Sequence, residues 1–229
     1  MFKLYYAPDN ASLVLRLVLE EAALPYEAIL VDREVKEQKT PEYLALNPTG
    51  LIPTLITPQG VLTETGACLL WFADTYPNAH FGPTKDDTKR GVFLRWLFYL
   101  SNTVHADLIR IFYPHRYVPK ETIDIHHNMI AGLLQNHFDI LDAAIRDQPS
   151  IFTPSSALTL YIGPLVRWSA LYPVSNKRWL DLSKYPSLEE LVVLLEERPS
   201  VRTAAAAEGL GNTPFSRPQL PNPPEGSAT

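Results

Sequence analysis

A serine at the start of the first expected helix is the first residue whose type and position suggest chemistry. Ser12 follows the turn Ala7-Pro8-Asp9-Asn10 and precedes apolar residues at helical spacing. Its structural role would be to cap that helix. Its chemical role would be to donate a hydrogen bond to an anion held by the unpaired N–H groups there. A thiolate is one such anion, and lowering a thiol pKa from about 8.5 to about 6.5 takes only about 2.7 kcal/mol.

The peptide Ile52-Pro53 is the second such segment. It lies between a turn, Asn47-Pro48-Thr49-Gly50, and an expected strand. Proline has no N–H to donate to a ladder there, and a trans bond is the ordinary form. A cis bond would instead turn the backbone N–H and C=O of Ile52 outward, as an edge for a bound peptide.

The pair Glu64-Thr65 is the third segment. Thr65 stands at the expected N-cap of a helix that runs to Tyr76. A ligand carboxylate could bind the free N–H groups of that helix while Glu64 holds an ammonium group. The three segments together predict a site for one small zwitterionic peptide that carries a thiol.

The elements that must position these segments follow from the hydrophobic pattern. The first 76 residues predict the order β-α-β, an irregular link, then β-β-α, with Pro58-Gln59-Gly60 as a tight hairpin turn. Long helical patterns follow, and the fourth carries a capping-box signature, Ser187-x-x-Glu190. All strands precede all long helices, which is typical of an α+β fold with two layers or two domains. The expected helices span residues 85–112, 120–147, 156–172, 187–198 and 201–208.

Composition narrows the function classes. The 229 residues carry a formal net charge of −5, which argues against nucleic acid or an anionic membrane as the main partner. Cys68 is the one cysteine, so an internal disulfide and a CxxC pair are excluded. The six histidines lack the usual ligand spacings, and we expect no metal. The start of the chain does not look like a signal peptide and no apolar run suits a membrane span, so we expect a cytoplasmic protein.

The three segments resemble the glutathione transferase superfamily. The resemblance covers about residues 1–210 and implies a thioredoxin-like N-terminal domain (β-α-β-α-β-β-α, residues 1–78) and an all-helical domain (85–210). Residues 211–229 are expected to form a proline-rich irregular tail. The matching text is Lys3-Leu-Tyr-Tyr-Ala-Pro, Ser12-Leu-Val-Leu-Arg16, Asn47-Pro-Thr-Gly-Leu-Ile-Pro53, Leu62-Thr-Glu-Thr65, Tyr185-Pro-Ser-Leu and Glu197-Arg-Pro-Ser-Val-Arg202.

Bacterial beta-class enzymes look nearest, through the Tyr-Tyr-x-Pro opening and His105. That class has a cysteine where this chain has Ala11, so no mixed disulfide with glutathione forms at that position. The resemblance therefore implies that Ser12 activates the thiol, with Tyr5 or Tyr6 as rivals and His105 near the sulfur.

The resemblance also implies two sets of ligand contacts. Leu51 stands where lysine or glutamine is common, so Lys36 or Lys39 would supply the contact to the glycyl carboxylate. In the stretch after His105, aromatic and cationic residues would line the second-substrate pocket, although they could also be an ordinary helix end or a short nucleic-acid patch. The glutathione contacts would be Asn10, Lys36, Lys39, Leu51, Ile52, Pro53, Glu64 and Thr65; the pocket would be lined by His105, Arg110, Phe112, Tyr113 and Arg116.

The function implied is that of a homodimeric cytoplasmic glutathione transferase of detoxification. Glutathione would be the co-substrate, the partner a small hydrophobic electrophile, and neither nucleic acid nor a membrane would be bound. Two alternatives stay open: a non-catalytic binding protein of the same fold, and a glutathione-dependent isomerase or ether-cleaving enzyme. In Ser156-Ala-Leu-Thr159 a threonine replaces the aspartate that usually completes a helix cap in the family, which should weaken that cap.

Overall fold

A four-stranded sheet forms the centre of the N-terminal half in the computed structural model, which describes residues 1–174 and 178–228. The strand order is β2-β1-β3-β4. β1 and β2 are parallel, whereas β3 pairs antiparallel with both β1 and β4. This arrangement confirms the thioredoxin-like order expected from the sequence. The strands are β1 (Phe2–Tyr6), β2 (Tyr26–Leu30), β3 (Thr54–Thr57) and β4 (Gly60–Thr63).

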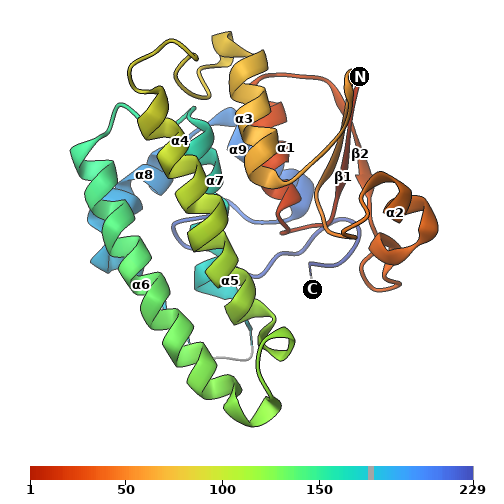
Figure 1. Cartoon of the computed structure of the whole chain (residues 1–229), viewed down its shortest axis with the longest axis vertical. Helices are drawn as coiled ribbons and strands as arrows, with labels where there is room; N and C mark the ends of the chain where they lie inside the picture. Colours follow the sequence, from red (N-terminus) through yellow and green to blue (C-terminus); the bar gives the residue numbers. More distant parts are fainter. Residues whose placement is uncertain (175–177, 229) are drawn as a thin grey trace.

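Three helices cover the two faces of the sheet (Figure 1). Side chains alternate along β1, so Phe2 points to one face and Tyr5 to the other. The Phe2 ring contacts Phe72 of α3, and the Tyr5 ring lies edge-on to Tyr43 of α2, with centroids 5.9 Å apart. The helices are α1 (Ser12–Glu21), α2 (Pro41–Leu46) and α3 (Thr65–Thr75).

The rest of the fold is helical, as the sequence predicts. The helix expected over 85–112 begins only at Arg90, because residues 85–89 form turns in which Asp87 accepts the Lys89 N–H. From there it consists of α4, a π-helical stretch at Leu100–Val104, and α5. A π turn is common at functional sites, and this one immediately precedes His105. The helices are α4 (Arg90–Tyr99), α5 (His105–Phe112), α6 (Ile123–Asp147), α7 (Ala157–Leu171), α8 (Pro186–Glu196) and α9 (Pro199–Glu208).

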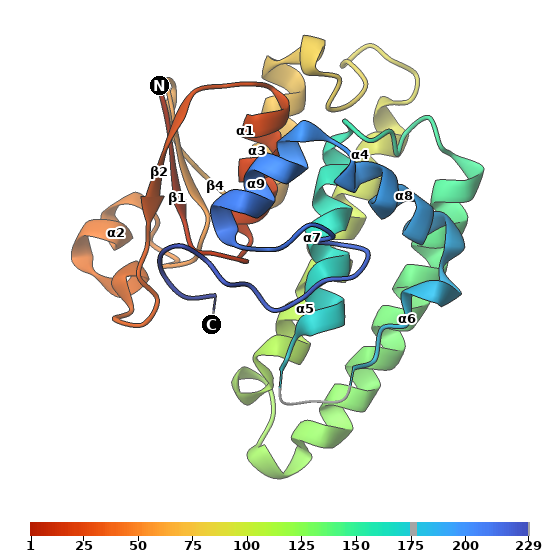
Figure 2. The same cartoon turned by 180° about the vertical axis from the view of Figure 1, so that it is seen from behind.

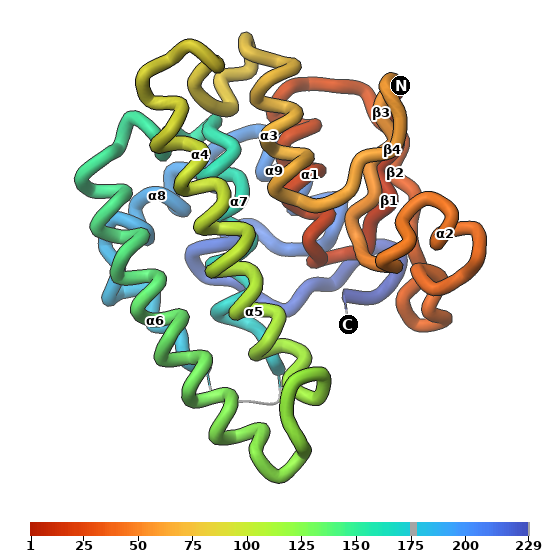
Figure 3. Tube along the Cα trace, in the orientation of Figure 1, coloured from red at the N-terminus to blue at the C-terminus, as the bar shows by residue number. Residues whose placement is uncertain are grey.

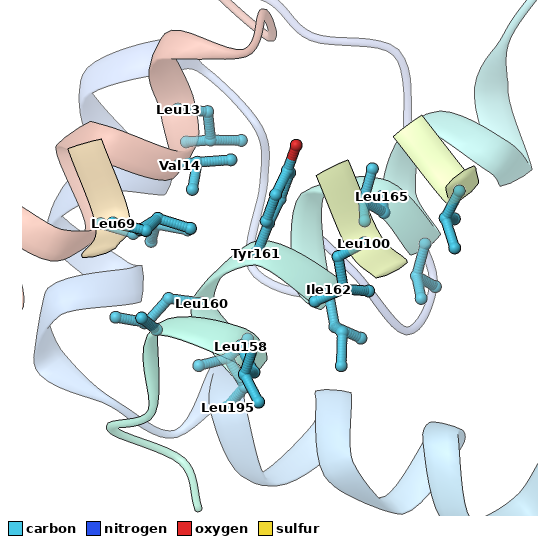
Figure 4. Packing of buried hydrophobic residues seen from close by; sticks show 14 of the residues in the cluster. Leu13, Val14, Leu69, Leu100, Leu158, Leu160, Tyr161, Ile162, Leu165 and Leu195 are labelled. Atoms are coloured by element: carbon cyan, nitrogen blue, oxygen red, sulfur yellow. The ribbon is translucent and has the colours of Figure 1, made fainter. Parts of the chain in front are cut away.

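The two halves share one hydrophobic core. Eight consecutive residues of α1 are buried because the sheet and α3 cover one side of this helix and α7 and α9 cover the other. Figure 4 shows the junction: Leu13 and Val14 of α1 and Leu69 of α3 face Tyr161 of α7. The position of every loop around α1 therefore depends on both halves of the chain.

Three expected helix caps are wrong, each for a local reason. Ser12 is the first residue of α1, and Ala11 is the N-cap. Likewise, Glu64 rather than Thr65 is the N-cap of α3. α8 begins at Pro186, because proline favours the first helical position, so Ser187 lies inside the helix and the capping box does not form.

The proline-rich tail has no helix or strand in the described residues 211–228. It runs from the end of α9 across α7 and ends beside the sheet (Figures 2 and 3). None of the helices in the described parts of the chain is long and apolar enough to cross a membrane.

Candidate functional site

The three segments singled out in the sequence meet at one end of the sheet. The antiparallel register places Tyr5 opposite Thr54. One residue further along the same antiparallel register, Pro53 lies opposite Tyr6. Ile52 then lies beside the loop that leads into α1. The N-termini of α1 and α3 flank this point, because both helices follow strands that end there and pack against each other.

The loop before β3 presents a free peptide edge. The Ile52-Pro53 bond is cis, the alternative that the sequence left open. The loop is held by two hydrogen bonds to the Leu51 carbonyl, from the Tyr43 hydroxyl at 2.7 Å and the Asn47 amide at 2.8 Å. Within the described chain, the backbone N–H and C=O of Ile52 have no hydrogen-bond partner. An extended peptide could therefore pair with Ile52.

The N-terminus of α3 is open to an anion. Glu64 has a φ of 68°, and no side chain caps the helix. The first N–H groups of a helix have no intrahelical partner, so those that begin at Thr65 are available to a ligand. Gly66 lies against the π-helical stretch, since a Cβ there would come within 3.2 Å of Ser101.

Ser12 is fully buried and its hydroxyl already has two partners. Its Oγ donates to the Ala7 carbonyl at 3.1 Å and accepts from the Ala7 N–H at 3.3 Å. Asn10, which is half-buried, accepts the Ala11 N–H through Oδ1 at 2.8 Å. Its amide Nδ2 has no partner within the described chain, so it is a free donor at the start of α1.

The two tyrosines proposed as rivals lie on opposite faces of the sheet. Tyr5 packs on α2 through its ring. The Tyr6 ring lies under the Arg16 guanidinium at 4.4 Å, and its hydroxyl donates to Glu225 in the tail. Burial, followed by the Glu225 carboxylate, raises the pKa of Tyr6 well above its usual value. Its proton is therefore retained and directed at Glu225.

His105 joins this region from the helical half. Its Nδ1 lies 2.6 Å from the Tyr161 hydroxyl, and its ring packs against Trp168 with centroids 5.5 Å apart. Burial lowers the pKa of His105 to about 4, so the imidazole is neutral at physiological pH. Burial and then the negative charge of Glu64 raise the pKa of Tyr161. Figure 4 shows the Tyr161 hydroxyl projecting beyond the leucines around it.

The other expected pocket residues follow His105 along α5 and the turn after it. The Phe112 ring lies edge-on to Tyr172, and the Arg116 guanidinium lies 4.1 Å from the Tyr113 ring centroid. These residues combine aromatic surface with positive charge, and their role as a pocket wall stays a prediction. Arg110 differs, because its charge is paired with Asp107 on its own helix at 2.8 Å.

The two expected lysines differ in their surroundings. Lys39 donates to the Thr49 carbonyl at 3.2 Å and lies against Gly50, in the turn that precedes the cis proline. Lys36 is exposed, and its side chain has no partner in the described chain. Among the described residues, no group of three or more His, Cys, Asp or Glu is placed to hold a metal.

A buried aspartate that the sequence analysis did not single out holds the loop before α1. Both Asp9 oxygens accept from Arg167, at 2.8 and 2.9 Å. Trp168 donates to the same carboxylate at 2.9 Å and Tyr172 at 2.7 Å. The Asp9 and Arg167 side chains are fully buried. A signal for this cluster exists in the sequence, because Arg167 is the one charged residue in the otherwise apolar α7.

Glu208 of α9 holds the same loop from a third side. One of its oxygens accepts from Arg16 at 2.8 Å and the other from the Asp9 N–H at 2.8 Å. Burial raises the pKa of Glu208 to about 7, although Arg16 acts in the opposite direction. The loop that carries Asn10 is thus fixed by charges from α1, α7 and α9.

Comparisons with known proteins agree with this geometry. Residues 11–75 match the family model described as "Glutathione S-transferase, N-terminal domain". The chain is 28% identical over 210 residues to "Glutathione S-transferase GST-4.5" of Xanthomonas campestris pv. campestris, covering 91% of this chain and 99% of that protein. It is 27% identical over 214 residues to "Glutathione S-transferase GstA" of Escherichia coli O157:H7, again covering 91% and 99%.

Solved structures are similar over the same length. A glutathione transferase homologue from Sulfitobacter with bound glutathione has 27% sequence identity and a TM-score of 0.76, covering 89% of this chain and 96% of that one. A bacterial beta-class glutathione S-transferase from Sphingomonas chungbukensis has 26% identity and a TM-score of 0.75, covering 90% and 98%. The matched domain bears the cis-proline loop and both helix N-termini described above. Over nearly its whole length the chain is similar to proteins of the glutathione transferase superfamily, a bacterial beta-class enzyme among them.

Proposed function

We propose that the chain is a glutathione transferase that binds glutathione at the cis-Pro53 loop and transfers it to a small hydrophobic electrophile. The observation that carries the proposal is the free backbone edge of Ile52 beside the uncapped N-terminus of α3. The superfamily relatives, among them a structure with bound glutathione, support the same ligand.

Each part of glutathione has a matching group in this site. The backbone of its cysteinyl residue pairs with Ile52, as a strand pairs with a sheet edge. The γ-glutamyl carboxylate accepts from the N–H groups at Thr65, and Glu64 holds the ammonium group. Lys39 supplies the charge for the glycyl carboxylate, with Lys36 as the alternative.

The sulfur then lies at the N-terminus of α1, where the helix dipole favours the thiolate. Ser12 is the first candidate for its hydrogen-bond donor. To donate to sulfur, its hydroxyl turns away from the Ala7 carbonyl and keeps the Ala7 N–H. Asn10 is the second candidate, because its amide Nδ2 is already free. Tyr6 is disfavoured while its proton is directed at Glu225.

The reaction needs no covalent bond to the protein. The thiol proton leaves to solvent, the thiolate forms a bond to the electrophilic carbon, and the leaving group departs with its electron pair. The neutral His105 ring borders the sulfur and adds no charge beside it. Phe112, Tyr113 and Arg116 suit an electrophile that has an aromatic group and a negative charge. Most of the rate enhancement comes from thiolate formation and proximity.

The test is the pKa of the bound thiol, followed by the ultraviolet absorbance of its thiolate and by the pH dependence of kcat/KM. If Ser12 is the donor, Ser12→Ala raises that pKa by about one unit or more, the equivalent of one charged hydrogen bond. If Asn10 is the donor, Asn10→Ala does so, and Ser12→Ala only lowers stability. Ser183→Ala, in an exposed turn, is the control. No glutathione binding at millimolar concentration contradicts the proposal; binding without turnover on alkyl and aryl electrophiles favours the non-catalytic alternative.

A substrate panel separates the remaining alternative. Turnover confined to isomerisation or ether cleavage, with no conjugation, identifies the isomerase or ether-cleaving enzyme, which shares the glutathione site.

We also propose that the protein is a cytoplasmic homodimer. Large apolar side chains are exposed on α4 and α6: Phe98 is 54% exposed, Ile125 70% and Met129 58%. We take these exposed apolar side chains as candidate contacts with a second copy of the chain. Light scattering at micromolar concentration tests it, and a mass equal to that of one chain contradicts it.

A further inference from the structure

Two arginine side chains meet at one tyrosine where the sheet half and the helical half of the chain face each other. Tyr113 directly follows α5, and the Arg116 guanidinium lies 4.1 Å from the centroid of its ring. Arg33 follows β2, and its guanidinium donates to the Tyr113 hydroxyl at 3.3 Å. One positive charge therefore comes from each half of the molecule. The sequence analysis did not single out Arg33, because no local pattern connects it with Tyr113.

Neither guanidinium is neutralised by an acidic side chain. Within the described part of the chain, Arg33 and Arg116 form no ion pair with an aspartate or glutamate. The other contact of Arg33 is to a neutral group, the Ala228 carbonyl, at 2.6 Å. Arg110 of α5, in contrast, is paired with Asp107. Like charges held close together repel each other, and a bound anion would remove this repulsion.

Arg33 lies near the start of α1, where the proposed site places the sulfur of glutathione. β2 runs parallel to β1, and just beyond their last pair the Val31 N–H donates to the Tyr6 carbonyl at 2.8 Å. The segment that carries Arg33 therefore leaves the sheet beside the loop that leads into α1.

Aromatic side chains connect this loop with the two arginines on the helical side. The Tyr172 hydroxyl donates to Asp9 of the loop at 2.7 Å. The Tyr172 ring lies edge-on to Phe112, with centroids 6.1 Å apart, and Phe112 precedes Tyr113 in the chain. An aromatic ring placed along these side chains would have one end toward the start of α1 and the other toward the guanidinium groups.

We propose that Arg33 and Arg116 bind an anionic group of the electrophile, a carboxylate or sulfonate, and make the protein selective for acidic aromatic electrophiles. The inference rests on the proposed function. Arg33 uses one N–H group for Ala228 and one for Tyr113, so its remaining N–H groups are free to donate to the anion. Guanidinium groups suit carboxylates because they donate parallel hydrogen bonds to both oxygens. The reactive carbon then lies across the ring from the anion, on the side of the sulfur.

The probes are 4-chloro-3-nitrobenzoate and its neutral counterpart, 4-chloro-3-nitrobenzamide. In both reactions the thiolate forms a bond to the carbon that carries chlorine, and chloride leaves with its electron pair. The carboxylate or the amide lies across the ring from this carbon and takes no part in bond making. Comparing the two probes within each variant separates recognition of the charge from the intrinsic reactivity of each compound.

Kinetics test the selectivity. Arg33→Gln and Arg116→Gln should each lower kcat/KM for the benzoate about tenfold, as expected for loss of a charged hydrogen bond, and for the benzamide less than about twofold. Arg95→Gln is the matched control, because the Arg95 guanidinium lies 4.5 Å from the Trp96 ring centroid in the same manner, but on the exposed side of α4. Equal losses for both probes overturn the proposal, as does an equal loss of benzoate activity in Arg95→Gln.

Calorimetry with the two reaction products gives a readout that does not depend on turnover. The carboxylated conjugate, S-(4-carboxy-2-nitrophenyl)glutathione, should bind Arg33→Gln about tenfold more weakly than the unchanged chain. The affinities of the carbamoyl conjugate and of glutathione should change less than about twofold. If glutathione affinity falls by the same factor, Arg33 binds the glycyl carboxylate instead, which overturns this proposal and leaves the glutathione site standing. If the unchanged chain binds neither glutathione nor the conjugates, the proposed function fails and the selectivity fails with it.

Discussion

Replacing Asp9 with asparagine should be among the most damaging single changes of polar side chains in this protein. Asparagine keeps the size of aspartate and also tolerates the left-handed backbone at φ 50°. The change therefore removes the charge without adding backbone strain. Arg167 is left fully buried with no carboxylate beside it.

The magnitude follows from the contacts. The carboxylate accepts four hydrogen bonds, from Arg167 (two), Trp168 and Tyr172. An amide offers one accepting oxygen and would present N–H groups to donors. Removing one partner of a buried ion pair costs about 3–5 kcal/mol. Arg167 also donates to two backbone carbonyls, which still solvate part of its charge after the substitution. We therefore expect Asp9→Asn to lower the free energy of unfolding by about 3 kcal/mol, the lower end of this range.

Urea unfolding followed by tryptophan fluorescence measures the effect, because Trp168 is part of the cluster. Glu27→Gln is the matched control: Glu27 pairs with Lys3 on the sheet, but both side chains are nearly half exposed. Such a pair contributes about 0–1 kcal/mol. A loss below about 1 kcal/mol for Asp9→Asn, or equal losses for both variants, would refute the view that this buried pair ties the loop to α7.

Three further predictions concern single groups. His105 has a folded pKa of about 4, below its unfolded value, so the free energy of unfolding should fall by about 2 kcal/mol as pH drops from 6.5 to 4. His105→Gln should remove this pH dependence in urea unfolding, and a pH dependence that persists in the variant contradicts the prediction. Thr159 Oγ1 is buried with no partner in the described chain, so Thr159→Val should raise the free energy of unfolding by about 1 kcal/mol and move the urea midpoint upward. A lower midpoint would show that the hydroxyl is paired. Asp142 of α6 accepts the Leu188 N–H at 2.9 Å near the start of α8, so Asp142→Ala should cost about 1–2 kcal/mol in thermal unfolding; a change below about 0.5 kcal/mol argues against this cap.

Local patterns were sufficient to predict the fold. Alternating residues and turn signals place the strands, and helical spacing places the helices, because both depend on neighbours a few residues away. The π-helical stretch was missed because it leaves the apolar pattern continuous across Leu100–Val104. The Ser187 capping box failed because Pro186 starts the helix first, and a carboxylate from α6 bonds the N–H of Leu188 instead.

The candidate site was predictable only in part, and the missing part is nonlocal. Segments such as Ile52-Pro53 and Glu64-Thr65 can be found from the sequence, because prolines and helix starts have local signatures. The partners of Asp9 and Tyr6 do not, since Arg167 and Glu225 lie more than 150 residues away in the chain. The Ser12 hydroxyl illustrates the same limit at short range, because its partner Ala7 becomes available only once the loop has closed.

A set of buried charges holds the loop before α1 and, with it, the start of that helix. Arg167 of α7 and Glu208 of α9 bind Asp9 in this loop, and Arg16 of α1 binds Glu208. Buried ion pairs add little net stability compared with apolar packing, but they favour one arrangement over others. Here that arrangement sets the direction of the first N–H groups of α1 and of the Asn10 amide. If glutathione binds as proposed, its sulfur lies beside these fixed donors, because moving the loop would separate the buried charges that hold it.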